Sequence, residues 1–137
     1  MEKLNPYIGL LGRFMIVLIF PLSGFAKAAG FSGTQAYMDS VGVPGVLLPL
    51  ALLLEFGGAL AIVVGWQTRI VAFLFAGFCL LTALVFHNQL GDQMQFLMFM
   101  KNVSMAGGFL LLSRYGAGEL SLDHWSLTRA RAAALTG

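Results

Sequence analysis

The chain has 137 residues, of which 58% are hydrophobic and 10% are charged, against about 45–50% and 25% in soluble domains. The mean hydropathy of +0.85 indicates an integral membrane protein, and the length predicts one domain. The net charge of +2 is small and scattered, which excludes the basic surface of a nucleic-acid-binding protein. Cys79 is the single cysteine and lies in an apolar segment, so an intrachain disulfide is excluded.

Four apolar segments approach or exceed the roughly 20 residues that a helix needs to cross a bilayer. Backbone groups in lipid must be hydrogen-bonded within their own segment, so each predicts a helix. The first follows MEKLNPY, and no small-residue cleavage site comes directly after Ala29. We therefore interpret it as a retained membrane helix and not as a signal peptide. The predicted fold is an all-α membrane protein, a four-transmembrane-helix bundle with spans at residues 6–29, 46–66, 70–87 and 96–113.

The connections between the spans differ in length. The first is glycine-rich, and we expect a loop with a short helix at Gln35–Ser40. Residues 67–69 leave room only for a tight hairpin, and HNQLGDQMQ joins the last two spans. Residues 114–137 form a more polar tail.

An even number of spans places both termini on one side of the membrane. Asp39 and Asp92 fall on the opposite side. Cytoplasmic segments are enriched in lysine and arginine, so we expect both termini and the tail in the cytoplasm. The basic residues on that side are Lys3, Arg69, Arg114, Arg129 and Arg131.

Ionisable residues inside the spans are the main functional signal. A charge at the bilayer centre costs about 2.5–3.5 kcal/mol on insertion scales, and such residues usually face the bundle interior and pair. At a rise of about 1.5 Å per residue, Arg13 and Glu55 differ in depth by about 6 Å, within reach of an arginine side chain. Lys101 lies a similar distance from Glu55 on the outer side, and His87 lies at the outer end of the third span.

The helical period predicts which side of the first span carries its charged residues. At about 100° per residue, one side of the first span carries Arg13, Phe20, Gly24 and Lys27. Pro21 should release the carbonyl of Val17 and kink the helix.

Two interpretations of these charges stay open. Arg13 and Glu55 could form a structural ion pair that fixes helix register. Alternatively, Lys101 leaves the group with excess positive charge, which favours a polar or anionic ligand or a proton path. His87 is either a proton donor or an interfacial polar residue. We predict no metal site and no haem, because His124 falls on the other side of the membrane.

The ordered motifs of the chain resemble the DoxX family of four-helix bacterial membrane proteins, in particular its YqjF-like branch. The resemblance covers residues 5–123, and Ala117 stands where the family often has proline. The motifs are Arg13 in the first span, then GFAK, YMDSVGVPG, LLEFGGALAIVVGWQTR, FH, FMKN, GGFLLL and GAGELSLD.

This resemblance implies a multi-pass protein of the bacterial inner membrane. The family is named for a small subunit linked to quinol oxidation and thiosulfate:quinone oxidoreduction. Some relatives carry redox-active cysteine pairs, which this chain lacks. By matching position, the family's polar intramembrane residues are Arg13, Glu55, His87, Lys101 and Asn102, and these are the candidate ligand-binding residues.

Three functions compete. The first is a subunit of a quinone- or quinol-linked redox complex that binds a quinone through Lys101, Arg13 or Asn102, with Glu55 or His87 exchanging protons. The chain carries no flavin, haem or metal motif, so a partner would supply the electrons and the protein would be at most one subunit of an enzyme. The second is a non-enzymatic assembly or scaffold subunit, and the third a carrier of protons or small solutes. Candidate partners are the lipid bilayer, redox-complex proteins and further copies of the chain.

Overall fold

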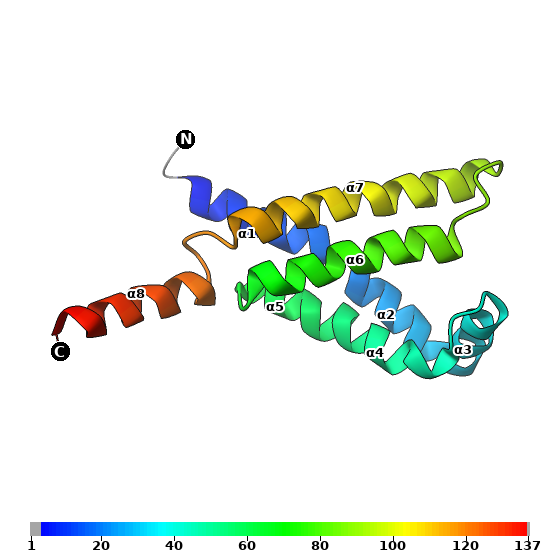
Figure 1. Ribbon diagram of the computed structural model, residues 1–137, viewed down its shortest axis with the longest axis horizontal. Helices are drawn as coiled ribbons and strands as arrows, with labels where there is room; N and C mark the ends of the chain where they lie inside the picture. Colours follow the sequence, from blue (N-terminus) through cyan, green and yellow to red (C-terminus); the bar gives the residue numbers. More distant parts are fainter. Residues whose placement is uncertain (1–3, 137) are drawn as a thin grey trace.

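The computed structural model describes residues 4–136 and contains four helical spans (Figure 1). Each is long and apolar enough to cross a membrane, which confirms the predicted bundle. The predicted limits differ from the observed ones by at most three residues. The observed spans are Asn5–Ala29, Gly45–Val64, Thr68–Phe86 and Gln93–Tyr115.

The first span is interrupted near its middle. Helix α1 (Asn5–Val17) ends four residues before Pro21, and α2 (Ile19–Ala29) continues after Leu18. Proline has no N–H to donate and its ring clashes with the carbonyl four residues earlier, so the predicted break at Val17 is confirmed. The predicted face is also confirmed: Arg13, Phe20 and Gly24 are buried and Lys27 is partly buried.

The second span is built from four short pieces. A 3₁₀ turn, η2 (Gly45–Leu47), leads into α4 (Leu48–Leu53), then a π-helical turn, η3 (Leu54–Gly58), and α5 (Ala59–Val64). These pieces contact α1, α2 and α6, so the second span is central to the bundle. Gly65 ends it in the left-handed conformation, with φ of 73°, which glycine adopts without a steric penalty.

The third and fourth spans form a long hairpin. Helices α6 (Thr68–Phe86) and α7 (Gln93–Tyr115) lie side by side along most of their length (Figure 1). Asp92 caps α7, because its side chain accepts from the backbone N–H of Gln95 at 2.8 Å. Because of this cap, α7 begins three residues before the predicted start of the fourth span.

Two helices outside the spans differ from the sequence-based expectation. The first loop contains α3 (Phe31–Ser40), which begins four residues before the predicted short helix. The tail, for which no helix was predicted, forms α8 (Leu122–Thr136) and extends away from the bundle (Figure 1). The first turns of α1 and the whole of α8 lie at the same end of the bundle (Figure 1), and the placement of both termini in the cytoplasm stays a prediction.

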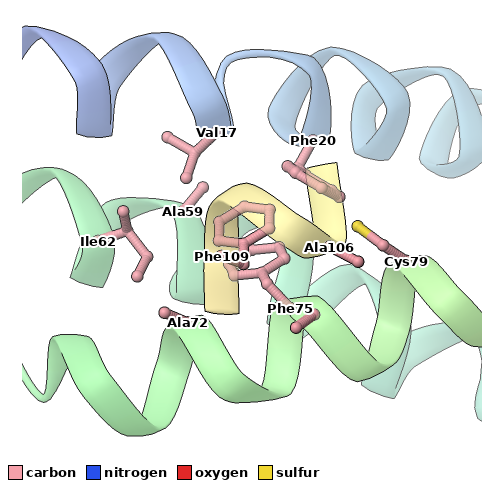
Figure 2. Packing of buried hydrophobic residues seen from close by; sticks show 10 residues of the cluster. Val17, Phe20, Ala59, Ile62, Ala72, Phe75, Cys79, Ala106 and Phe109 are labelled. Atoms are coloured by element: carbon pink, nitrogen blue, oxygen red, sulfur yellow. The ribbon is translucent and has the colours of Figure 1, made fainter. Parts of the chain in front are cut away.

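The apolar core joins all four spans around a cluster of aromatic rings (Figure 2). Phe20 of α2 lies 4.5 Å from Phe75 and 5.7 Å from Phe109, measured between ring centroids. Phe75 and Phe109 stack at 4.9 Å with 12° between their planes. Such ring pairs contribute about 0.5–1.5 kcal/mol beyond area burial. The remaining members are Val17, Ala59, Ile62, Ala72, Ala76, Cys79 and Ala106.

Asp123, at the start of α8, caps the first turn of α6. Its two carboxylate oxygens accept from the backbone N–H groups of Gln67 and Thr68 at 2.8 and 2.9 Å. Its own N–H donates to the carbonyl of Gly65 at 2.8 Å. The segment after α7 is therefore tied to the hairpin between the second and third spans.

We expect Asp123→Ala to lower the free energy of unfolding by about 1–2 kcal/mol, because two N–H groups at a helix start lose their acceptor. Thermal unfolding in detergent measures this loss. Glu119→Ala, which removes an exposed acid from the same segment, is the matched control and should unfold with the wild type. Equal stability of the two variants would contradict a capping role.

Candidate functional site

The intramembrane acid Glu55 pairs with Lys27. Glu55 is 1% exposed and its Oε1 accepts from the Lys27 ammonium, the one ion pair found within residues 4–136. Lys27 is 30% exposed and also donates to Ser23 Oγ at 3.0 Å. The pair therefore connects a buried carboxylate of the second span to a partly accessible cation of the first.

The backbone around Glu55 is specialised for this position. Glu55 lies in the π-helical turn η3, an element that occurs mostly as single turns and frequently at functional sites. On the facing helix, Gly24 makes room for it. A β-carbon at residue 24 would lie 2.9 Å from the Phe56 ring and 3.3 Å from Glu55 Oε2. Glycine at this point therefore allows α2 to approach the carboxylate closely.

The second carboxylate oxygen has no partner. Within the described residues, Glu55 Oε2 is buried and makes no hydrogen bond. A buried acceptor without a donor costs about 1–3 kcal/mol, and more when it is charged. An O–H or N–H group brought by a bound molecule would relieve this cost. Glu55 Oε2 is thus the atom of this site with unused hydrogen-bonding capacity.

Aromatic rings lie beside the pair. Phe56 follows Glu55 in the chain, and its ring packs edge-to-face against Phe25 of α2 at 5.0 Å. The site therefore combines one cation, one carboxylate and an apolar aromatic wall, which is a typical composition for a small-molecule site.

Arg13 occupies a separate place, so the interpretation in which Arg13 and Glu55 form a structural ion pair is wrong. Its guanidinium donates to the carbonyl oxygens of Ile62 at 3.1 Å and Val63 at 2.8 Å, and to that of Leu120. The first two belong to the last turn of α5, where carbonyl groups lack a full set of intrahelical donors, and the Ile62 carbonyl also accepts from the N–H of Gly65 at 3.2 Å. Arg13, 2% exposed, therefore ties α1 to the end of the second span and to the segment before α8.

The remaining candidates each contact a near neighbour in the chain. Lys101 Nζ lies 3.4 Å from the sulfur of Met98, and Asn102 Nδ2 donates to the Met98 carbonyl at 2.9 Å. His87 Nδ1 lies 3.0 Å from Gln95 Oε1, across the turn between α6 and α7. Their role toward a ligand stays a prediction.

Sequence reasoning did not count Lys27 among the site residues. The helical period placed Lys27 on the buried face of the first span, near its outer end, but assigned it no partner. The depth estimate compared backbone positions, whereas a lysine side chain can extend about four carbons toward a buried partner. Searching for an acid within that reach would have identified Glu55.

No set of three or more His, Cys, Asp or Glu side chains within residues 4–136 is arranged to hold a metal ion. His87 lies at the end of α6, and His124 lies on α8 and is exposed. The chemistry available at the candidate site is therefore that of a carboxylate and an ammonium group.

Comparison with known proteins identifies relatives of this chain. The DoxX family model matches residues 8–88. The inner membrane protein YqjF of Escherichia coli K12 is 48% identical over 123 residues, covering 90% of this chain and 95% of that protein. The inner membrane protein YphA of the same organism is 42% identical over 126 residues, covering 87% and 90%. No solved structure matches the chain significantly.

Proposed function

The chain belongs to the DoxX family and is a multi-pass inner membrane protein, and we propose that it binds a quinone or quinol at Glu55 and Lys27 as one subunit of a redox complex. The observation that carries this proposal is the buried carboxylate oxygen Glu55 Oε2, which has no hydrogen-bond partner among the described residues.

The two charged groups complement the two forms of a quinone headgroup. A quinol hydroxyl is a donor and would bond to Glu55 Oε2. A quinone carbonyl is an acceptor and would bond to the Lys27 ammonium, which is partly accessible. The Phe25 and Phe56 rings offer an apolar surface to the headgroup. Because the carboxylate can also hold a proton, the same site suits proton exchange with a quinol.

Quinol oxidation releases two electrons and two protons, and the protein would contribute binding and proton acceptance. Cys79 is the single cysteine of the chain, so it has no partner within the chain with which to form a redox-active disulfide. A partner subunit would carry the electrons in this proposal, and the site on this chain would hold the headgroup.

We expect a short-chain ubiquinol to bind the purified protein and Glu55→Gln to weaken that binding at least tenfold. A hydrogen bond to a charged group is worth about 1.5–3 kcal/mol, and about 1.4 kcal/mol corresponds to tenfold. The same substitution should weaken the binding of the oxidised quinone less, because the quinone carbonyls would bind chiefly to Lys27. Isothermal titration calorimetry in detergent measures both affinities.

Glu119→Gln removes an exposed acid in the segment after α7 and serves as the matched control. It should bind ubiquinol as the wild type does. Absence of binding by the wild-type protein, or equal binding by the wild type and Glu55→Gln, would refute the proposal. Thermal unfolding of each variant establishes that it is folded.

A further inference from the structure

A groove with a different character lies between α1 and α7, near the first turns of α1 and the last turns of α7. The groove has a volume of about 300 Å³, and glycine residues of both helices line it. Gly9 and Gly12 come from α1, and Gly108 comes from α7. A β-carbon at residue 12 would have no atom within 4 Å, so the space beside it is empty.

The lining of the groove is mostly apolar. Ile8 of α1 and Leu111 of α7 line it and are largely exposed. Tyr115, at the last turn of α7, is 75% exposed and marks its mouth. Tyrosine is enriched where the hydrocarbon meets the headgroups. The groove is thus suited to an acyl chain, with a polar headgroup at Tyr115.

Positive charge surrounds the same mouth. Arg13 lines the groove, and its Nε has no acceptor among the described residues. The Arg69 guanidinium lies beside Gly116, where a β-carbon would be 3.4 Å from Arg69 Nε. The Arg114 guanidinium lies 5.9 Å from the centroid of the Tyr115 ring.

The acids nearby form no close ion pair with these arginines. Within the described part of the chain, none of these three arginines has a carboxylate oxygen within 4.0 Å. Asp123 and Glu119 line the adjoining hollow. The Asp123 carboxylate keeps its negative charge while it accepts from two backbone N–H groups, and it attracts Arg13 at longer range. Glu119 is exposed, and the three arginines outnumber these two acids by one.

We propose that this groove binds one anionic glycerophospholipid. The phosphodiester lies at Arg69 and Arg114, and an acyl chain follows the glycine-lined wall past Gly12 toward the membrane interior. Arg13 adds positive potential from the floor of the groove. Basic pockets between membrane helices are known to recognise anionic headgroups, with about 1 kcal/mol for each basic residue near the surface. This site is separate from Glu55 and Lys27 and does not depend on the proposed function.

Native mass spectrometry of the full chain in detergent tests this proposal, with phosphatidylglycerol and phosphatidylcholine as probes. We expect the wild type to bind phosphatidylglycerol more tightly. Arg69→Gln should weaken phosphatidylglycerol binding about fivefold, with little effect on phosphatidylcholine. Gly12→Leu should fill the groove and abolish the specific adduct. Its control is Gly107→Leu, because Gly107 is exposed on α7, outside the groove lining, and also has open space beside it.

Equal affinity of the wild type for the two lipids would overturn the proposal, and so would undiminished binding by Gly12→Leu. Arg69→Gln provides an independent variant at an exposed residue, so a folding defect in Gly12→Leu would not leave the site untested. If Arg69→Gln binds phosphatidylglycerol as tightly as the wild type does, the headgroup does not lie at this arginine. Ubiquinol binding in the same variants should be unchanged, which separates this result from the Glu55 site.

Discussion

Replacing Arg13 with methionine should lower the free energy of unfolding by about 3–5 kcal/mol, among the largest losses for a single substitution in this protein. The guanidinium donates to the carbonyl oxygens of Ile62, Val63 and Leu120. Hydrogen bonds to a charged group contribute about 1.5–3 kcal/mol each. Methionine preserves much of the apolar stem but has no donor, so the three oxygens would lose their charged partner together.

Lipid makes this loss more severe than it would be in water. The Ile62 and Val63 carbonyls belong to the last turn of α5, where intrahelical donors run out, although Ile62 also accepts from the N–H of Gly65 at 3.2 Å. Within the span, hydrocarbon provides no water to replace the guanidinium at the Ile62 and Val63 oxygens, whereas Leu120 lies in the exposed segment after α7. Arg13 also joins three segments distant in the sequence, so its removal should loosen the contact of α1 with α5 and with the segment leading to α8.

Titration with dodecyl sulfate in mixed micelles, followed by circular dichroism, measures this effect. Arg13→Lys should fall between the wild type and Arg13→Met, because an ammonium has donors but not the planar fork of the guanidinium. Arg131→Met, on the exposed face of α8, is the matched control. An unfolding midpoint for Arg13→Met equal to that of Arg131→Met would show that these hydrogen bonds do not stabilise the fold.

The spans were predictable because the bilayer imposes one strong constraint on composition. A run of about 20 apolar residues has few alternatives to a membrane helix, and Pro21 has one dominant local effect. The observed limits of the spans differ from the predicted ones where a capping residue determines the end of a helix. Asp92 extends α7 toward its N-terminus, and Gly65 ends α5 before the predicted limit of the second span.

The partners of the buried charges were not predictable in the same way. The acceptors of Arg13 are backbone carbonyls, which leave no signature in the residue types around them. The π-helical turn at Glu55 depends on a change from i+4 to i+5 hydrogen bonding, which an apolar pattern does not reveal. Helix α8 has no strong apolar period, so nothing in the residue pattern distinguished it from an irregular tail.

Lys27→Met should also destabilise the protein by about 3–5 kcal/mol, for a different reason. The substitution leaves the Glu55 carboxylate buried at 1% exposure without its cation, and removing one partner of a buried ion pair typically costs this much. The double variant Lys27→Met/Glu55→Met removes both charges. Apolar residues in place of a buried pair are often neutral or stabilising, so the double variant should regain most of the loss.

Comparing stability and binding across this cycle separates the two roles of the pair. Lys101→Met is the control, because it removes a partly buried cation that has no carboxylate within 4.0 Å in the described chain, and it should not destabilise the fold. If the pair serves a ligand, the double variant will be stable yet unable to bind ubiquinol. If the double variant is as unstable as Lys27→Met, then removing the unpaired carboxylate restores no stability. That result would mean that the bundle needs both charges to fold.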